Sequence, residues 1–130
     1  MIDGIAGFKL SLQGDDEDLV RKLHALARYC KNLGVTVVLI DEIDSVTGDF
    51  RATDTGISYL ADNILFLRHV EAGGELRKTV GVLKKRVGDF ERTLREFSLE
   101  TDTGLSVGEP LRDMQGILRG TPAVDDAGTE

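Results

Sequence analysis

The chain has 130 residues, 41% hydrophobic and 30% charged, which is enough for one domain with a modest core and excludes a disordered chain. No apolar run approaches the roughly 20 residues of a membrane helix, and residues 1–4 show no secretory signal, so we expect a cytoplasmic protein with no membrane partner. The formal net charge of −7 argues against nucleic-acid binding by the whole surface.

Residues 1–12 read as a strand end followed by a loop, because Gly4 and Gly7 are turn-like. The clearest helix pattern follows. Asp15 or Asp16 is expected to cap it, and Gly34 to end it. One apolar stripe runs along it at helical spacing. The single cysteine lies on this stripe, so we expect a buried structural thiol. The stripe consists of Leu19, Val20, Leu23, Leu26, Ala27, Cys30 and Leu33.

Residues 35–40, "VTVVLI", form an unalternating β-branched run that predicts a strand covered on both faces. A helix followed by such a strand indicates a parallel α/β unit. Residues 44–56 are polar and read as a loop or lid. A helical turn and a second buried strand over 64–67 are expected next.

The remaining elements are expected to be antiparallel. "EAGGE" (71–75) is typical of a hairpin turn, and 76–86 would be the return strand, with Val80 and Val82 on one face. Two more strands are predicted over 93–100 and 105–111, joined by a turn. The first 119 residues would then form the domain, and the acidic, aperiodic segment 120–130 a disordered tail.

Two groups of acidic side chains could serve a ligand. Asp3 follows a strand end, where parallel sheets place ligands and where a carboxylate can orient magnesium, although a lone Asp there is more often a turn residue. Asp41, Glu42 and Asp44 follow the next strand at the same sheet end, where a solvated loop is the simpler interpretation. No His–Cys group has zinc spacing, and no nucleophile motif occurs.

Residues 83–97 hold five of the sixteen Lys and Arg residues. Lys84 and Arg86 are two apart on a predicted strand, so they should project from one face while Lys85 points away. A lysine and a planar guanidinium aimed together suit a phosphate. Spacing alone leaves two interpretations open, a solvated strand edge and a phosphate site.

Residues 34–43, "GVTVVLIDEI", and residues 53–111, above all "GISYLADNI" to "LREF", closely resemble the C-terminal half of a KaiC-like, RecA-superfamily ATPase domain. The resemblance covers about residues 1–120. It implies an α/β chain with a partial RecA-like P-loop NTPase fold, in which a mainly parallel sheet with helices is joined to a C-terminal antiparallel β-hairpin region.

The resemblance also implies functional residues. Asp3 would be the Walker B carboxylate that orients Mg²⁺. Lys84 and Arg86 match the two cations of a segment that reaches the triphosphate held by a neighbouring subunit. With Glu42, these residues form the candidate set for ATP and Mg²⁺. Full-length relatives form hexameric rings, so a homo-oligomer is expected.

Three departures from the family pattern limit what is carried over. Phe90 stands where that segment usually has His, so a third phosphate contact is not expected. The phosphorylated Ser-Thr pair of the clock protein aligns with Ser58 and Tyr59, which leaves Ser58 as a possible phosphosite and favours the non-clock group. The sequence contains no G-x-x-x-x-G-K-[ST], and the family's catalytic glutamates would precede Met1.

The leading interpretation is therefore a segment of a KaiC-like ATPase that is inactive alone and needs a P-loop-containing partner half. In the family the P-loop strand lies between the strands at 35–40 and 63–68, so those strands would pair directly or accept a strand from another copy. One alternative is an oligomerising regulatory or interaction module without nucleotide chemistry. Another is a nucleic-acid-binding RecA-type remnant, against which stand 5% aromatic residues and no Trp.

Overall fold

A computed structural model describes residues 1–13, 15–42, 57–112, 114–115 and 123–124. These residues fall into two compact units, which we describe separately: 1–13, 15–42 and 57–61 in the first, and the described residues from 62 onward in the second. The elements in chain order are β1 (Ile2–Asp3), α1 (Ile5–Leu12), α2 (Asp16–Asn32), β2 (Leu39–Ile40), the 3₁₀ helix η1 (Ile57–Tyr59), β3 (Asn63–Ala72), β4 (Glu75–Lys85), β5 (Arg95–Glu100), β6 (Gly104–Pro110), β7 (Met114–Gln115) and β8 (Ala123–Val124).

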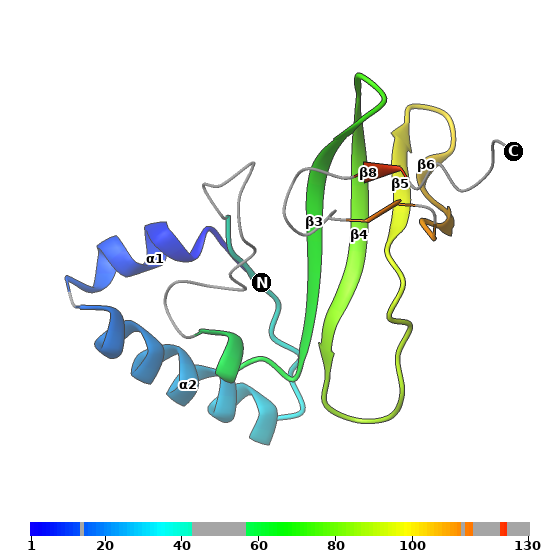
Figure 1. The fold of residues 1–130 in the computed structure, drawn as a ribbon. Helices are drawn as coiled ribbons and strands as arrows, with labels where there is room; N and C mark the ends of the chain where they lie inside the picture. The colour runs from blue at the N-terminus through cyan, green and yellow to red at the C-terminus, as the bar shows by residue number, and fades with distance from the viewer. Residues whose placement is uncertain (14, 43–56, 113, 116–122, 125–130) are drawn as a thin grey trace, which may run out of the picture. The chain divides into compact units, whose positions relative to one another are not determined.

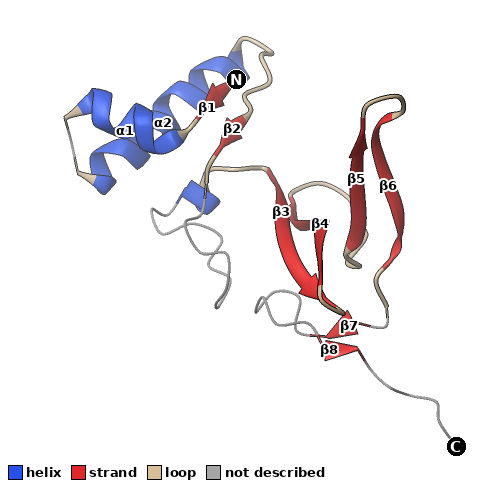
Figure 2. Cartoon of the chain, turned by 90° about the horizontal axis from the view of Figure 1, so that it is seen from above, coloured by secondary structure: helices blue, strands red, loops and turns tan. Residues whose placement is uncertain are grey.

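The first unit is a small parallel α/β arrangement. Strands β1 and β2 pair in parallel, with Ile2 opposite Leu39 and Asp3 opposite Ile40, and helices α1 and α2 lie between them in the chain (Figure 2). The core of the unit comes from both helices and both strands. It consists of the buried Ile5, Leu19 and Leu23 and the partly buried Ile2, Phe8, Leu12, Val20, Leu39 and Leu60.

Helix α2 begins and ends where its sequence predicts. The Asp15 side chain accepts a hydrogen bond of 2.8 Å from the Asp18 backbone N–H. Three acidic residues in the first turn interact favourably with the positive end of the helix dipole. Gly34 follows the last turn with φ +72°, the left-handed conformation that glycine adopts without strain. The apolar stripe is only partly covered, since Leu33 is 62% exposed.

The loop expected after residue 4 is wrong, because residues 5–12 form α1. Gly4 takes φ +78° at the start of this helix. Ile5, Phe8 and Leu12 then recur at helical spacing and pack into the core of the unit. The burial of these three side chains outweighs the helix-weakening effect of Gly7.

The strand expected over 35–40 with both faces covered is also wrong in extent and burial. Only Leu39 and Ile40 are in a strand, and Val35 and Val38 are about half exposed, at 52% and 50%. The described strand partner of β2 is the two-residue β1, which offers too few backbone groups to extend the pairing. Leu39 packs on the core, whereas Ile40 is 37% exposed.

The second unit is built on a long antiparallel hairpin of β3 and β4 (Figure 1). Its two-residue turn, Gly73–Gly74, has φ +62° and +78°, as the predicted hairpin requires. Strand β3 alternates rather than being buried on both faces. Phe66 and Val70 are buried, whereas Leu65 and Leu67 are 69% and 68% exposed.

Strands β5 and β6 form where the sequence predicts them and extend the hairpin to a sheet of order β3-β4-β5-β6; β7 and β8 pair separately. The α/β class is confirmed, with β1–β2 as the parallel pair and the larger described sheet antiparallel. Strands β2 and β3 belong to different described sheets and to different units, and their direct pairing stays a prediction. The expected boundary after residue 119 lies outside the described residues. Neither described helix is both long and apolar enough to cross a membrane.

We predict that Asp15→Ala lowers the free energy of unfolding by about 1 kcal/mol, because the Asp18 N–H loses its capping acceptor. Urea unfolding followed by the helical circular dichroism signal measures this loss. Glu17→Ala is the matched control, since it removes the same charge from the same turn but leaves the cap in place. Equal losses in the two variants would show that charge, and not capping, stabilises this end of α2.

Candidate functional site

The first group of candidate residues lies at the carboxyl end of the β1–β2 pair. Asp3 is the last residue of β1 and lies opposite Ile40, the residue before Asp41 and Glu42. All three acidic side chains are exposed. The structure thus brings Asp3, Asp41 and Glu42 to one end of the parallel pair, as predicted, while Asp44 lies outside the described residues.

The acidic side chains fit an indirect role toward Mg²⁺ better than a protein-built metal cage. Within the described ranges, no three His, Cys, Asp or Glu side chains come together in a way that could hold a metal ion. Mg²⁺ usually keeps several waters and takes one or two carboxylates together with substrate phosphates. An exposed strand-end carboxylate such as Asp3 suits that arrangement, and its role in magnesium binding stays a prediction.

The second group lies at the end of β4, where the strand register changes. Phe66 pairs with Gly81 and Leu65 with Val82, but Ile64 pairs with Lys84, so Leu83 is an extra residue, a β-bulge. Residues paired directly opposite share a face of the sheet. The bulge therefore moves Lys84 to the face that carries Phe66, away from the face of Val82.

Arg86 continues this pairing beyond the end of the strand and is held by Asp62. The Arg86 backbone N–H donates to the Asp62 carbonyl oxygen at 2.9 Å, and Nη1 of its guanidinium lies 2.6 Å from Oδ1 of the Asp62 carboxylate. The two side chains are 64% and 41% exposed. Lys84 and Arg86 thus follow the same face, as predicted, and sequence reasoning missed Asp62.

Besides Arg86, three more cations in residues 83–97 contact other described residues. Lys85 Nζ donates to the Asp89 carbonyl oxygen at 2.8 Å, and the Arg92 guanidinium lies 6.0 Å from the centre of the Phe90 ring. Arg95 belongs to the network described next. The basic run is therefore neither a bare solvated edge nor a uniform phosphate-binding surface.

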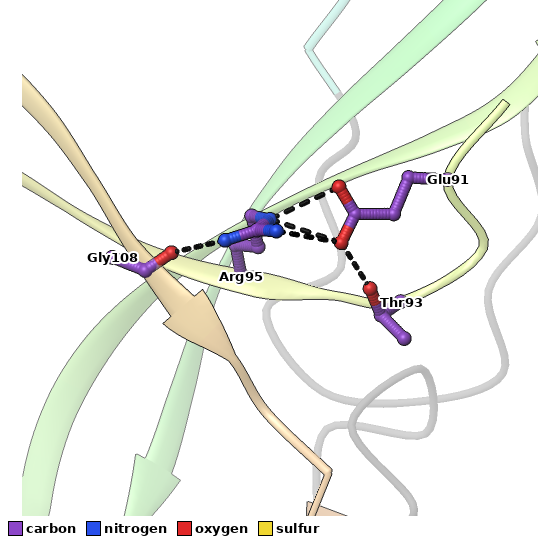
Figure 3. A network of polar contacts seen from close by, with 4 residues as sticks. All are labelled: Glu91, Thr93, Arg95 and Gly108. Carbon is purple, nitrogen blue, oxygen red and sulfur yellow. Dashed lines mark hydrogen bonds and ion pairs between the residues drawn. The ribbon is translucent and has the colours of Figure 1, made fainter.

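Arg95 links the segment before β5 to β6 (Figure 3). Its Nε lies 3.0 and 3.1 Å from the two carboxylate oxygens of Glu91, and its Nη1 donates to the Gly108 carbonyl oxygen at 2.8 Å. The Thr93 hydroxyl donates to the same carboxylate. A guanidinium that contacts both a carboxylate and a backbone carbonyl fixes the local path of the chain.

The hydrogen bond from Arg95, and then the one from Thr93, lower the pKa of the Glu91 carboxyl below that of an ordinary glutamate. A lowered pKa in the folded chain means that the stabilising contribution is complete above the ordinary glutamate pKa. It is lost as pH falls through the lower value of the folded chain. The network thus connects the 91–95 segment to β6, and the stability that it contributes falls at acidic pH.

The remaining sequence candidates are placed as follows. Ser58 is partly buried in η1, while Tyr59 beside it is 87% exposed, and a phosphorylation role for Ser58 stays a prediction. Phe90, which replaces the histidine of the family segment, faces Arg92. Cys30 is partly buried rather than fully buried, which corrects the expectation for this thiol.

Comparison with known proteins identifies the family. A family model for the KaiC ATPase matches residues 1–112. This chain belongs to the KaiC ATPase family. It is similar to circadian clock protein KaiC3 of Synechocystis sp., with 35% identity over 97 residues, and to the circadian clock oscillator protein KaiC of Synechococcus elongatus, with 30% identity over 94 residues.

The matched segment is a large part of this chain and a small part of each relative. It covers 75% of this chain and 19% of KaiC3, and 72% of this chain and 18% of the Synechococcus protein. The chain thus spans about a fifth of the length of the curated relatives it matches. It is a segment of KaiC-family ATPase sequence. That it takes part in the activity of a whole KaiC protein is a proposal.

We predict that Arg95→Gln raises the pKa of the Glu91 carboxyl, because the donor chiefly responsible for lowering that pKa is removed. A carbon-13 NMR titration of the side-chain carboxyls measures this shift. The pKa of Asp18, which is lowered chiefly by its hydrogen bond with Lys22 in the first unit, serves as the internal control and should not move. An unchanged Glu91 pKa would mean that Arg95 does not bond this carboxylate in solution.

Proposed function

We propose that this chain supplies one side of an ATP site between subunits of a KaiC-family ATPase. In this proposal Lys84 and Arg86 contact the triphosphate held by a neighbouring subunit, and Asp3 orients the magnesium ion of a nucleotide site. The observation that carries the proposal is the pairing beyond the β-bulge at Leu83. Lys84 pairs with Ile64 and the Arg86 backbone N–H bonds the Asp62 carbonyl oxygen, so the two cations lie two residues apart along one face at the end of β4. This segment lies inside the region that matches the family model.

The two cations differ in what they offer a phosphate. Lys84 provides a compact point charge, whereas the planar Arg86 guanidinium can donate two parallel hydrogen bonds to phosphate oxygens. Bound Mg²⁺ would neutralise charge on the β- and γ-phosphates. Glu42 lies with Asp3 at one end of the β1–β2 pair and is its companion in the proposed nucleotide-binding set.

The phosphate cradle must come from other residues. The printed sequence has no G-x-x-x-x-G-K-[ST], so it supplies neither a nest of P-loop backbone N–H groups nor the P-loop lysine. A P-loop-containing partner half would supply both. The chain by itself is therefore expected to hydrolyse ATP no faster than the background reaction.

We predict that Arg86→Ala lowers ATP turnover strongly, by roughly 10³–10⁵ as for other arginine fingers, when the chain is combined with a KaiC-family partner that carries the P-loop. Nucleotide binding should be largely spared, because the P-loop supplies most of it. Lys85→Ala is the matched control, since Lys85 bonds the Asp89 carbonyl and lies outside the proposed phosphate contacts. If the Arg86→Ala and Lys85→Ala mixtures turned over ATP equally, the trans role of Arg86 would be wrong.

A second proposal, self-association, rests on the exposed face of the four-stranded sheet. Paired residues share a face and alternate residues of a strand point the same way, so β3 to β6 present one set of mainly apolar side chains. Six of its large apolar members are more than half exposed, and such patches commonly mark interfaces. They are Leu65, Leu67, Leu76, Leu99, Leu105 and Val107.

The proposed partner on this face is another copy of the chain, as in the hexameric ring that the family resemblance implies. The alternative of a nucleic-acid-binding remnant gains no support from the basic run. Lys85, Arg92 and Arg95 already contact other residues of the chain. An interaction module without nucleotide chemistry, the other alternative, would also self-associate through this face. It would differ from the first proposal only in making no phosphate contacts.

We predict that light scattering on the purified chain gives a mass above that of one copy. Leu99→Glu should shift the chain toward the monomer, because a buried interfacial carboxylate costs free energy. Leu10→Glu is the control, since Leu10 is 81% exposed on α1 and lies outside this face. A monodisperse wild-type monomer would contradict self-association.

A further inference from the structure

Arg86 is already engaged at the end of the β3–β4 hairpin. Its guanidinium Nη1 lies 2.6 Å from Oδ1 of Asp62, and its backbone N–H bonds the Asp62 carbonyl oxygen at 2.9 Å. The backbone bond fixes where Arg86 leaves the strand, and the ion pair fixes where its side chain points. Arg86 is therefore oriented before any phosphate arrives.

The Asp62 carboxylate and a phosphate would compete for the same group. Both are anions that accept hydrogen bonds from a guanidinium, and Nη1 of Arg86 already donates to Asp62. The carboxylate would also repel a phosphate placed beside Arg86 and Lys84. Both side chains of the ion pair are substantially exposed, at 64% and 41%, so exchanging one anion for the other requires no buried charge to be uncovered.

We propose that Asp62 is a positioning residue that holds Arg86 in place and competes with the phosphate for it. This inference rests on the proposed function and adds a built-in regulation of that site. The carboxylate keeps Arg86 aimed while no triphosphate is present, and it lowers the affinity of the Lys84 and Arg86 pair for anions. A polyphosphate displaces the carboxylate from Nη1 when it binds.

The test measures binding of inorganic tripolyphosphate to the full chain by isothermal titration calorimetry at low salt. Asp62→Asn keeps the size of the side chain and its carbonyl acceptor but removes the charge, so it should tighten binding about threefold, within the range of exposed ion pairs. Glu91→Gln is the matched control. It removes the charge from another carboxylate paired with an arginine in the same unit, and it should leave the affinity unchanged.

A second measurement uses the wild-type chain and does not depend on how a variant folds. On titration with tripolyphosphate, the carbon-13 signal of the Asp62 carboxylate should shift as Arg86 leaves it, while that of Glu91 should stay. A structural role alone predicts neither this shift nor a gain in affinity. The inference would be overturned if the Asp62 signal stayed fixed at saturation, or if Asp62→Asn failed to tighten binding.

Arg86→Ala and Lys84→Ala separate this inference from the proposed function. If both weaken tripolyphosphate binding while Asp62→Asn does not tighten it, the phosphate site stands and the competition by Asp62 is wrong. If neither weakens binding, the proposed phosphate site itself is wrong. Equal tightening by Asp62→Asn and Glu91→Gln would show a general effect of net charge and would also overturn the role of Asp62.

Discussion

The pairing of β3 with β4 determines how the second unit presents its side chains. The Gly73–Gly74 turn sets the register at one end, with Ala72 opposite Glu75, and that register continues to Leu65 opposite Val82. Extended to the strand ends, it would place Asp62 opposite Lys85. The bulge at Leu83 shifts the pairing by one residue, so that Asp62 instead meets Arg86. One extra residue thus selects which cation the carboxylate holds and moves Lys84 to the other face of the sheet.

The charges near the basic run act locally, although the chain as a whole carries −7. Arg95 and Glu91 join the segment before β5 to Gly108 on β6, and Lys85 closes the turn that contains Asp89. Such exposed contacts contribute little stability each but restrict the path of the backbone. Most cations of this basic cluster therefore contact other residues of the chain, and Lys84 and Arg86 are the members that the proposed function needs.

The predictions that the structure confirms are those that depend on only a few neighbouring residues. The cap at Asp15, the stop at Gly34 and the turn at Gly73–Gly74 each depend on a few neighbouring residues, and all three are confirmed. The predictions for residues 5–12 and 35–40 failed because both depend on distant partners. Ile5 becomes helical by packing against Leu19 and Leu23, and residues 35–38 stay outside a strand where β1 offers only two paired residues.

The sequence by itself determined the α/β class, the family, helix α2, the β3–β4 hairpin and the identity of Asp3, Lys84 and Arg86 as candidates. These follow from periodicity, capping, turn chemistry and motif resemblance, which all depend on residues close together in the sequence. Only the tertiary structure decided that Asp62 holds Arg86 and that Lys84 shares the face of Phe66. The reason is that a β-bulge leaves no simple local pattern, since it depends on how two whole strands fit side by side.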